Sequence, residues 1–219
     1  MRLEQKVVIV TGGGRGIGAA ICQAFANEGA HVVVADINED NAKDVAKKIG
    51  GKAIGVALDV RSPEGANSMA KGVIEKFGRI DVLMNNAGAR VIKGLMQHTQ
   101  DDWQQMLDIN LTGPFICSQA VLPQMLKQKS GNIINVASIA SFMGRPNRVA
   151  YVAAKSGVLG LTRAMAADLS GKTIRVNAIA PGMVASPFNQ SFAEAEDTGP
   201  AWASENLIGR WGQPEDIAG

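Results

Sequence analysis

Short apolar runs rich in β-branched residues alternate with longer amphipathic stretches along the chain. The runs are almost continuously apolar, as parallel strands buried on both faces of a sheet should be. The stretches between them repeat apolar residues at helical spacing. This alternation predicts an α/β fold in which helices cover both faces of a doubly wound parallel sheet, in three layers. The predicted strands are Val7–Val10, His31–Ala35, Ala53–Leu58, Asp81–Met84, Asn132–Val136 and Ile174–Ile179.

Two helix boundaries can be predicted in detail. Ser62 followed by Pro63 is a strong helix start, because the hydroxyl can cap the helix and proline suits the first turn. A long helical stretch contains Asn110, Gly113 and Pro114, so we expect a break or kink there. The predicted helices are Gly16–Glu28, Glu39–Ile49, Pro63–Phe77, one or more within Gln100–Lys127, and Val149–Leu169.

Composition narrows the class of protein. A chain of 219 residues that is 46% apolar suits one domain, 1–219. The net charge of +2, with both signs interspersed, argues against nucleic acid as a partner. The sequence has no signal-peptide pattern and no apolar run near the ~20 residues that span a bilayer, so we expect a soluble, cytoplasmic protein without a membrane partner.

The two cysteines, Cys22 and Cys117, fall within apolar helical patterns. We interpret them as small buried hydrophobic residues in a reducing compartment. They have no metal-site spacing with the two histidines, His31 and His98, so no metal is expected.

A glycine-rich turn follows the first predicted strand. Residues 11–18 read TGGGRGIG, a T-G-x-x-x-G-x-G spacing that differs from G-x-G-x-x-G. Such a turn lets backbone N–H groups approach a pyrophosphate at a helix N-terminus. The structural alternative is a turn whose glycines serve packing only.

The second predicted strand is followed by Asp36, which bears on the choice of cofactor. A carboxylate there can accept hydrogen bonds from the adenosine ribose and would repel a 2′-phosphate, which favours NAD. Arg15 favours the opposite choice, because a guanidinium can bind that phosphate, so NADP is not excluded. Asp59, Asn85 and Asn86 follow two further strands, and the carboxyl ends of parallel strands meet in one ligand-binding crevice.

Tyr151 is the only tyrosine in the chain, and Lys155 follows it by four residues. On a helix these two side chains share a face, so an ammonium group would lie beside the phenol and lower its pKa. Tyr151 could then serve as a general acid and base near neutral pH. The structural alternative is a solvated surface pair. Ser138, upstream of the tyrosine, adds a hydroxyl that can polarise a carbonyl.

Taken together, these motifs resemble the short-chain dehydrogenase/reductase family, in its compact single-domain branch with a Rossmann-type fold. The resemblance covers essentially the whole chain, and it implies a cofactor half at about 1–90 and a catalytic half at about 91–219. It is carried by TGGGRGIG at 11–18, NNAG at 85–88, Asn110, the S…YxxxK set of Ser138, Tyr151 and Lys155, RVNAIAPG at 175–182 and GRWGQPEDIA at 209–218.

The resemblance implies a role for each matching residue. Tyr151 transfers the proton, Lys155 lowers its pKa and binds the nicotinamide ribose, Ser138 orients the substrate oxygen, and Asn110 holds a water that links Lys155 to solvent. It also implies an NAD(P)-dependent oxidoreductase that interconverts a secondary alcohol and a ketone. The cofactor-binding residues, by resemblance and from the turn itself, are Gly12, Arg15, Gly16, Ile17, Gly18, Asp36, Ile37, Asp59, Val60, Asn86, Ala87, Gly88, Tyr151, Lys155, Pro181, Gly182, Val184 and Ser186.

Members of this branch usually continue through a seventh strand, whereas this sequence stops at Gly219, so we expect that strand to be missing. The resemblance also implies a homo-oligomer, a dimer or a tetramer. Substrate preference should come from 89–98, 139–150 and a lid at 187–207, where Arg90, Arg145 and Arg148 could favour an anionic substrate. Two alternatives stay open: an NADPH-dependent carbonyl or 3-oxoacyl thioester reductase, and a non-catalytic dinucleotide-binding sensor.

Overall fold

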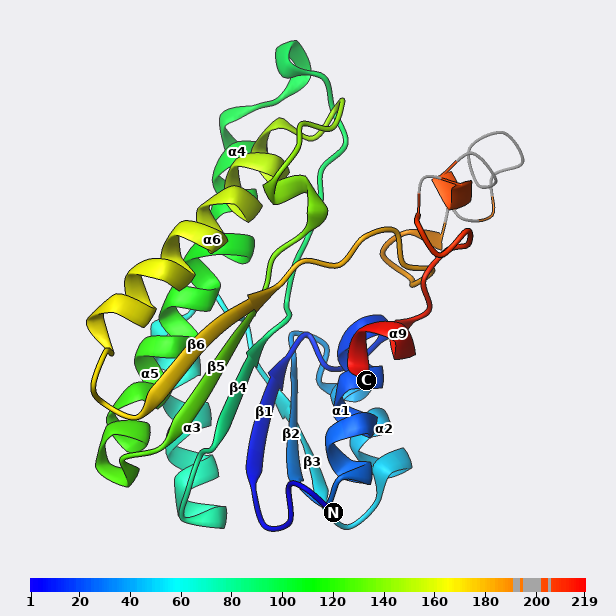
Figure 1. The fold of residues 1–219 in the computed structure, drawn as a ribbon. Coiled ribbons are helices and arrows are strands. Elements are labelled where there is room, and N and C mark those ends of the chain that lie inside the picture. The colour runs from blue at the N-terminus through cyan, green and yellow to red at the C-terminus, as the bar shows by residue number, and fades with distance from the viewer. Residues whose placement is uncertain (191–193, 195–201, 205) are drawn as a thin grey trace.

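The computed structural model describes residues 1–190, 194, 202–204 and 206–219. Its described strands form one parallel sheet in the order β3-β2-β1-β4-β5-β6 (Figure 1). The order reverses between β1 and β4, as in doubly wound sheets that bind ligands at this switch point. The prediction of a doubly wound α/β fold is confirmed. The strands are β1 (Val7–Thr11), β2 (His31–Asp36), β3 (Ala53–Ala57), β4 (Val82–Asn85), β5 (Gly131–Val136) and β6 (Ile174–Ile179).

Helices cover both faces of the sheet, which gives the three predicted layers (Figure 1). One face carries α1 (Gly16–Asn27), α2 (Glu39–Ile49) and α9 (Pro214–Ala218), and the other carries α3 (Pro63–Phe77), α4 (Gln100–Leu107), α5 (Gly113–Gln128) and α6 (Val149–Asp168). Alternate residues of β1 serve the two faces: Val7 and Ile9 pack toward α3 and α5, and Val8 and Val10 toward α1 and α2. Cys22 and Cys117 are buried in these two cores, as predicted. No described helix is both long and apolar enough to cross a membrane.

The predicted start of α3 is confirmed in detail. The Ser62 hydroxyl accepts a hydrogen bond from the Gly65 N–H at 2.9 Å, and Pro63 occupies the first turn. The other predicted boundaries agree with the structure within one or two residues.

The predicted break in the long helical stretch is also present, but its form is a π-helical turn. Residues Asp108–Thr112 form this turn between α4 and α5. A π turn inserts an extra residue into a helix and is frequent at functional sites. Pro114 lies in the first turn of α5, directly after this π turn. The turn places the side chain of Asn110 inside the protein, fully buried.

Candidate active site

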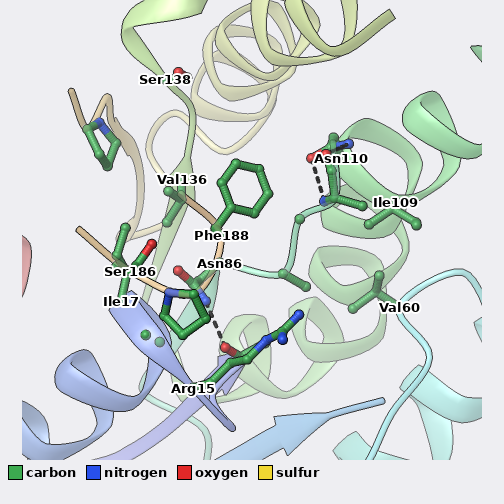
Figure 2. A pocket seen from close by; sticks show the side chains of 18 of the residues that line it. Arg15, Ile17, Val60, Asn86, Ile109, Asn110, Val136, Ser138, Ser186 and Phe188 are labelled. Carbon is green, nitrogen blue, oxygen red and sulfur yellow. Dashed lines mark hydrogen bonds between the residues drawn. The ribbon is translucent and has the colours of Figure 1, made fainter. Parts of the chain in front are cut away.

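A cavity of about 420 Å³ runs along the carboxyl ends of the strands (Figure 2). All the residues that the sequence predicted to be catalytic or to bind a cofactor line this cavity, although they come from segments far apart in the chain. Their individual roles stay predictions. The lining set includes Gly12, Arg15, Gly16, Ile17, Gly18, Asp36, Ile37, Asp59, Val60, Asn86, Ala87, Gly88, Asn110, Ser138, Tyr151, Lys155, Pro181, Gly182, Val184 and Ser186.

The glycine turn is built by close backbone contacts that only glycine permits. Gly12 has a φ of 62°, and a Cβ on it would lie 2.8 Å from the Cα of Ala87. A Cβ on Gly18 would lie 2.1 Å from the carbonyl oxygen of Gly12. The Asn86 side-chain amide donates to the Thr11 and Gly12 carbonyls at 3.0 Å each, which ties the loop after β4 to the turn after β1. These contacts hold the glycine turn in one backbone conformation at the switch point of the sheet.

The N-terminus of α1 opens onto this cavity with its first N–H groups uncapped by side chains. Arg15, at the N-cap position, makes no side-chain capping bond, and the first turn holds no acidic residue. By contrast, Asn38 caps α2 through the Asn41 N–H, with acids in the first turn. Uncapped N–H groups together with the helix dipole suit a phosphate. This geometry fits the pyrophosphate of a dinucleotide.

Asp36, at the end of β2, has its carboxylate held against the glycine turn. It accepts hydrogen bonds from the Gly14 N–H at 2.9 Å and from the Asn38 N–H at 3.0 Å. The negative charge therefore has a defined position on the cavity wall, beside the exposed Ile37.

Arg61 is a lining residue that the sequence reasoning missed. Its guanidinium forms a bidentate ion pair with Asp59, with the shortest contact at 2.6 Å. This hydrogen bonding holds the pKa of Asp59 below its ordinary value. The sequence did contain a signal for this ion pair: Arg61 follows Asp59 by two residues, directly after a predicted strand.

Lys155 is buried, and its ammonium nitrogen donates to the carbonyl of Val136 at 2.7 Å. Burial lowers the pKa of Lys155 to about 8. Its nitrogen lies 6.0 Å from the centre of the Tyr151 ring. The two residues do share a helix face, but the amine is directed at the end of β5 and not at the phenol oxygen.

The expected effect of Lys155 on Tyr151 is therefore corrected. Burial raises the pKa of Tyr151 above its ordinary value, against smaller lowering effects from a hydrogen bond with Ser138 and from the charges of Arg90 and Arg148. The sequence reasoning weighed the helical spacing and missed the burial, which favours the neutral phenol. It also missed the two arginines as neighbours of the phenol, since both lie outside the YxxxK motif.

Asn110 and Gly88 lie together beside Lys155. The Asn110 amide donates to the carbonyls of Ala89 and Met106 at 3.0 Å, and its oxygen accepts from the Ala89 N–H at 3.2 Å. A Cβ on Gly88 would lie 3.0 Å from the Asn110 oxygen and 3.7 Å from the Lys155 nitrogen. The glycine therefore leaves space between the amide and the amine.

Comparison with known proteins agrees with this geometry. The family model for the short chain dehydrogenases matches residues 6–197. The chain belongs to this family. It is 39% identical to "3-oxoacyl-(acyl-carrier-protein) reductase FabG" of Thermotoga maritima, over 100% of this chain and 89% of the relative. It is 42% identical to a 3-oxoacyl-(acyl-carrier-protein) reductase of Synechocystis, over 99% of this chain and 87% of the relative. The crystal structure titled "Crystal structure of gox2181" superposes with a TM-score of 0.95 at 34% identity, over 99% of this chain and 87% of that one.

As a short-chain dehydrogenase, the protein is an oxidoreductase that acts on CH–OH groups with NAD(P). The structure also places two residues from outside the family motifs, Phe188 and Arg90, next to Tyr151. The ring of Phe188 lies 6.2 Å from that of Tyr151, and Arg90 stacks on Phe188 with its guanidinium carbon 4.5 Å from the ring centre. Arg90 also donates to the Phe188 carbonyl at 2.8 Å. Most of the predicted lid at 187–207 lies outside the described residues.

The lowered pKa of Lys155 in this dehydrogenase predicts a pH-dependent stability. In the unfolded chain the amine keeps its proton up to about 10.5, whereas the folded protein releases it above about 8. Between these values the unfolded state binds more protons, so the free energy of unfolding should rise with pH, by up to roughly 3 kcal/mol. Lys155→Met should lack this rise. Urea unfolding of the ligand-free protein across this pH window measures it.

Lys172→Met is the matched control for this prediction, because Lys172 is an exposed lysine away from the cavity. It should keep the pH dependence of the wild type. The same pH slope in Lys155→Met as in the wild type would show that Lys155 does not titrate in this window.

Proposed function

We propose that the protein interconverts a secondary alcohol and a ketone, with NAD as the preferred cofactor and Tyr151 as the general acid and base. The observation that carries this proposal is the convergence of Tyr151, Ser138 and Lys155 on one cavity that also contains the glycine turn. An alcohol or carbonyl oxygen bound between the two hydroxyls would lie at the catalytic end of that cavity.

The cavity residues fit a dinucleotide. The glycine turn and the uncapped start of α1 would hold the pyrophosphate, and Asp36 would hold the adenosine ribose. A bound nicotinamide supplies the hydride donor or acceptor. Pro181, Gly182, Val184 and Ser186 line the same cavity and would face the ring.

The chain's own residues then handle the proton. Ser138 and Tyr151 would donate hydrogen bonds to the substrate oxygen and stabilise the charge that develops on it. In reduction, Tyr151 would give its proton to that oxygen, and in oxidation it would accept the proton. The space beside Gly88, between Asn110 and Lys155, is where a water could connect the site to solvent.

NAD-linked oxidation of a panel of secondary alcohols, polyols and hydroxy acids tests the proposed function. We expect at least one compound to be turned over at a rate that depends on Tyr151. Turnover that persists without the tyrosine hydroxyl would contradict the proposed role.

The cofactor preference rests on the charge of Asp36. We expect the wild type to bind NADH at least about tenfold more tightly than NADPH, a difference of about 1.4 kcal/mol. Asp36→Asn keeps an oxygen that can accept from the Gly14 N–H but removes the charge, so the preference for NADH should be lost. Fluorescence titration with the two reduced cofactors measures both values.

Asp40→Asn is the matched control, because Asp40 is an exposed acid in the first turn of α2 that does not line the cavity. It should leave the ratio of affinities unchanged. Tighter NADPH binding by the wild type would instead favour Arg15 as the deciding residue.

A second candidate function is the NADPH-dependent reduction of a 3-oxoacyl thioester. The names of the Thermotoga and Synechocystis relatives favour it, whereas Asp36 disfavours NADPH. Reduction of acetoacetyl-N-acetylcysteamine with NADPH and with NADH decides between the two: rapid turnover with NADPH alone supports the thioester reductase. The homo-oligomer and the cytoplasmic location stay predictions, and sedimentation velocity of the purified chain tests the first.

A further inference from the structure

Ser138 lies at the start of a single 3₁₀ turn, η3 (Ile139–Ser141), which follows β5 and precedes the loop to α6. Its hydroxyl accepts a hydrogen bond from the Ala140 N–H at 3.1 Å, as a capping residue does. A serine hydroxyl has one proton and two acceptor lone pairs, so this bond leaves the proton for Tyr151 or for a substrate oxygen. The position of the Ser138 hydroxyl therefore depends on the position of η3.

The backbone at Ser138 is held by bonds to two different parts of the protein. The N–H groups of its neighbours, Ala137 and Ile139, donate to carbonyl groups at the end of β6 and just beyond it, at 2.8 and 3.1 Å. The Ser138 N–H between them has another acceptor, the hydroxyl of Ser141, at 3.3 Å. A side chain thus supplies one of the bonds that fix the backbone of the predicted catalytic serine.

The same Ser141 hydroxyl also binds α6. It donates to the backbone carbonyl of Lys155 at 2.7 Å, a usual length for an O–H···O bond. Because a hydroxyl can donate and accept at the same time, one oxygen atom connects the backbone of Ser138 with that of Lys155. Tyr151 lies one turn earlier on the same helix. Ser141 therefore joins the turn that carries Ser138 to the helix that carries the other two predicted catalytic groups.

A second serine bond joins the same two elements and allows a comparison. Ser156, which is exposed on α6, donates to the backbone carbonyl of Ser141 at 3.4 Å. This bond is near the limit of hydrogen-bond length and does not involve Ser138. Of these two serine hydroxyls, that of Ser141 is the one that holds Ser138 as well as α6.

We propose that Ser141 is a positioning residue that sets the distance between the Ser138 hydroxyl and the Tyr151 phenol. The inference rests on the proposed function, since it adds a residue to the same site. Ser141 is not among the residues that line the cavity, so it would act through Ser138 and not by touching the substrate. Such an effect can be large, because a misplacement of about 1 Å can lower a rate by about a hundredfold.

Tyr151 allows a test without turnover, because it is the only tyrosine in the chain. Protein in which 3-fluorotyrosine replaces tyrosine gives one fluorine NMR signal, whose chemical shift follows the ionisation of this phenol. The fluorine also lowers the pKa of the phenol, which brings the titration closer to neutral pH. The hydrogen bond with Ser138 lowers the pKa of Tyr151, so displacement of Ser138 should raise it. The variants below retain the charges of Arg90, Arg148 and Lys155 near the phenol.

Ser141→Ala should raise the measured pKa of Tyr151 by at least about 0.4 unit, the equivalent of a net hydrogen bond. It should lower kcat for the best compound of the alcohol panel at least about tenfold and change NADH affinity by less than about twofold. Ser138→Ala should also raise the pKa of Tyr151. In the Ser138→Ala background, Ser141→Ala should change neither the pKa of Tyr151 nor kcat any further, because the hydroxyl that it positions is gone.

Ser156→Ala is the matched control, since it removes a serine bond between the same two elements. It should leave the pKa of Tyr151 and kcat as in the wild type, and Ser141→Thr, which keeps the hydroxyl, should do the same. If Ser141→Ala does not fold, Ser141→Cys replaces it, because a thiol is only a weak donor and acceptor.

Three results would overturn the proposal. The first is a wild-type pKa of Tyr151 in the Ser141 variant that lacks the hydroxyl. The second is an equal effect of that substitution with and without the Ser138 hydroxyl. The third is the same change in Ser156→Ala, which would assign the effect to the general packing of η3 on α6.

Because the fluorine titration measures the phenol without turnover, the role of Ser141 and the proposed reaction can fail separately. Tyr151-dependent turnover together with a wild-type pKa of Tyr151 in Ser141→Ala would overturn only the role of Ser141. A raised pKa of Tyr151 in Ser141→Ala that depends on the Ser138 hydroxyl, without Tyr151-dependent turnover, would support the positioning role and overturn the proposed reaction.

Discussion

Replacing Tyr151 with Phe should lower kcat by about a thousandfold while changing the affinity for NADH by less than about twofold. The substitution removes one oxygen atom, and with it the proton that the proposed reaction transfers to or from the substrate. No other tyrosine in the chain can substitute for it. Steady-state turnover of the best compound from the alcohol panel, together with NADH titration, measures both effects.

The ring contact with Phe188 should survive in Tyr151→Phe, because it involves the aromatic face and not the hydroxyl. Its thermal unfolding midpoint should therefore stay close to that of the wild type, which separates a lost proton donor from a lost fold. A kcat within about tenfold of the wild type would show that another group supplies the proton.

Replacing Gly18 with Ala should abolish cofactor binding, with an affinity loss of at least about a hundredfold, near 2.7 kcal/mol. The added Cβ would lie 2.1 Å from the Gly12 carbonyl oxygen and 2.9 Å from the Gly12 carbonyl carbon. Both are backbone atoms, so the turn itself must move. That movement would also disturb the Asn86 amide, whose hydrogen bond to the same carbonyl ties the turn to the loop after β4. NADH titration measures the loss.

Gly160→Ala is the control for this substitution, because Gly160 lies on α6 with no atom within 4 Å of an added Cβ. It should leave cofactor affinity unchanged and raise the free energy of unfolding by about 0.5–1 kcal/mol, since alanine favours the helix over glycine. An NADH affinity in Gly18→Ala equal to that of the wild type would mean that the turn can widen without cost.

The fold was predictable because the hydrophobic patterning agrees with it along the chain. Apolar runs marked the six strands and helical spacing marked the longer helices, and the Ser62–Pro63 start of α3 depends only on neighbouring residues. The family motifs likewise identified residues that the structure gathers around one cavity. The requirement for glycine at position 18 could be predicted from the sequence, because the contact that excludes a side chain there is with Gly12 in the same turn.

The sequence could not predict the pKa of Tyr151, because that pKa depends on how deeply the phenol is buried and on which charges lie near it. The four-residue spacing of Tyr151 and Lys155 predicted a phenol with a lowered pKa, but burial raises it and the lysine amine is bound to Val136. Burial depends on how β5, α6 and the segment after β6 pack together, and no local pattern records that packing.

The sequence by itself thus determined the α/β fold, the glycine turn and the family, because each can be read from short patterns whose own residues lie close together in the chain. Only the tertiary structure decided which charges face Tyr151. Arg90 lies 61 positions before it, yet both Arg90 and Arg148 act on its pKa and line one small hollow beside it. Electrostatic effects depend on distance and burial in space, and for residues this far apart in the chain both are set by the folded sheet and its loops.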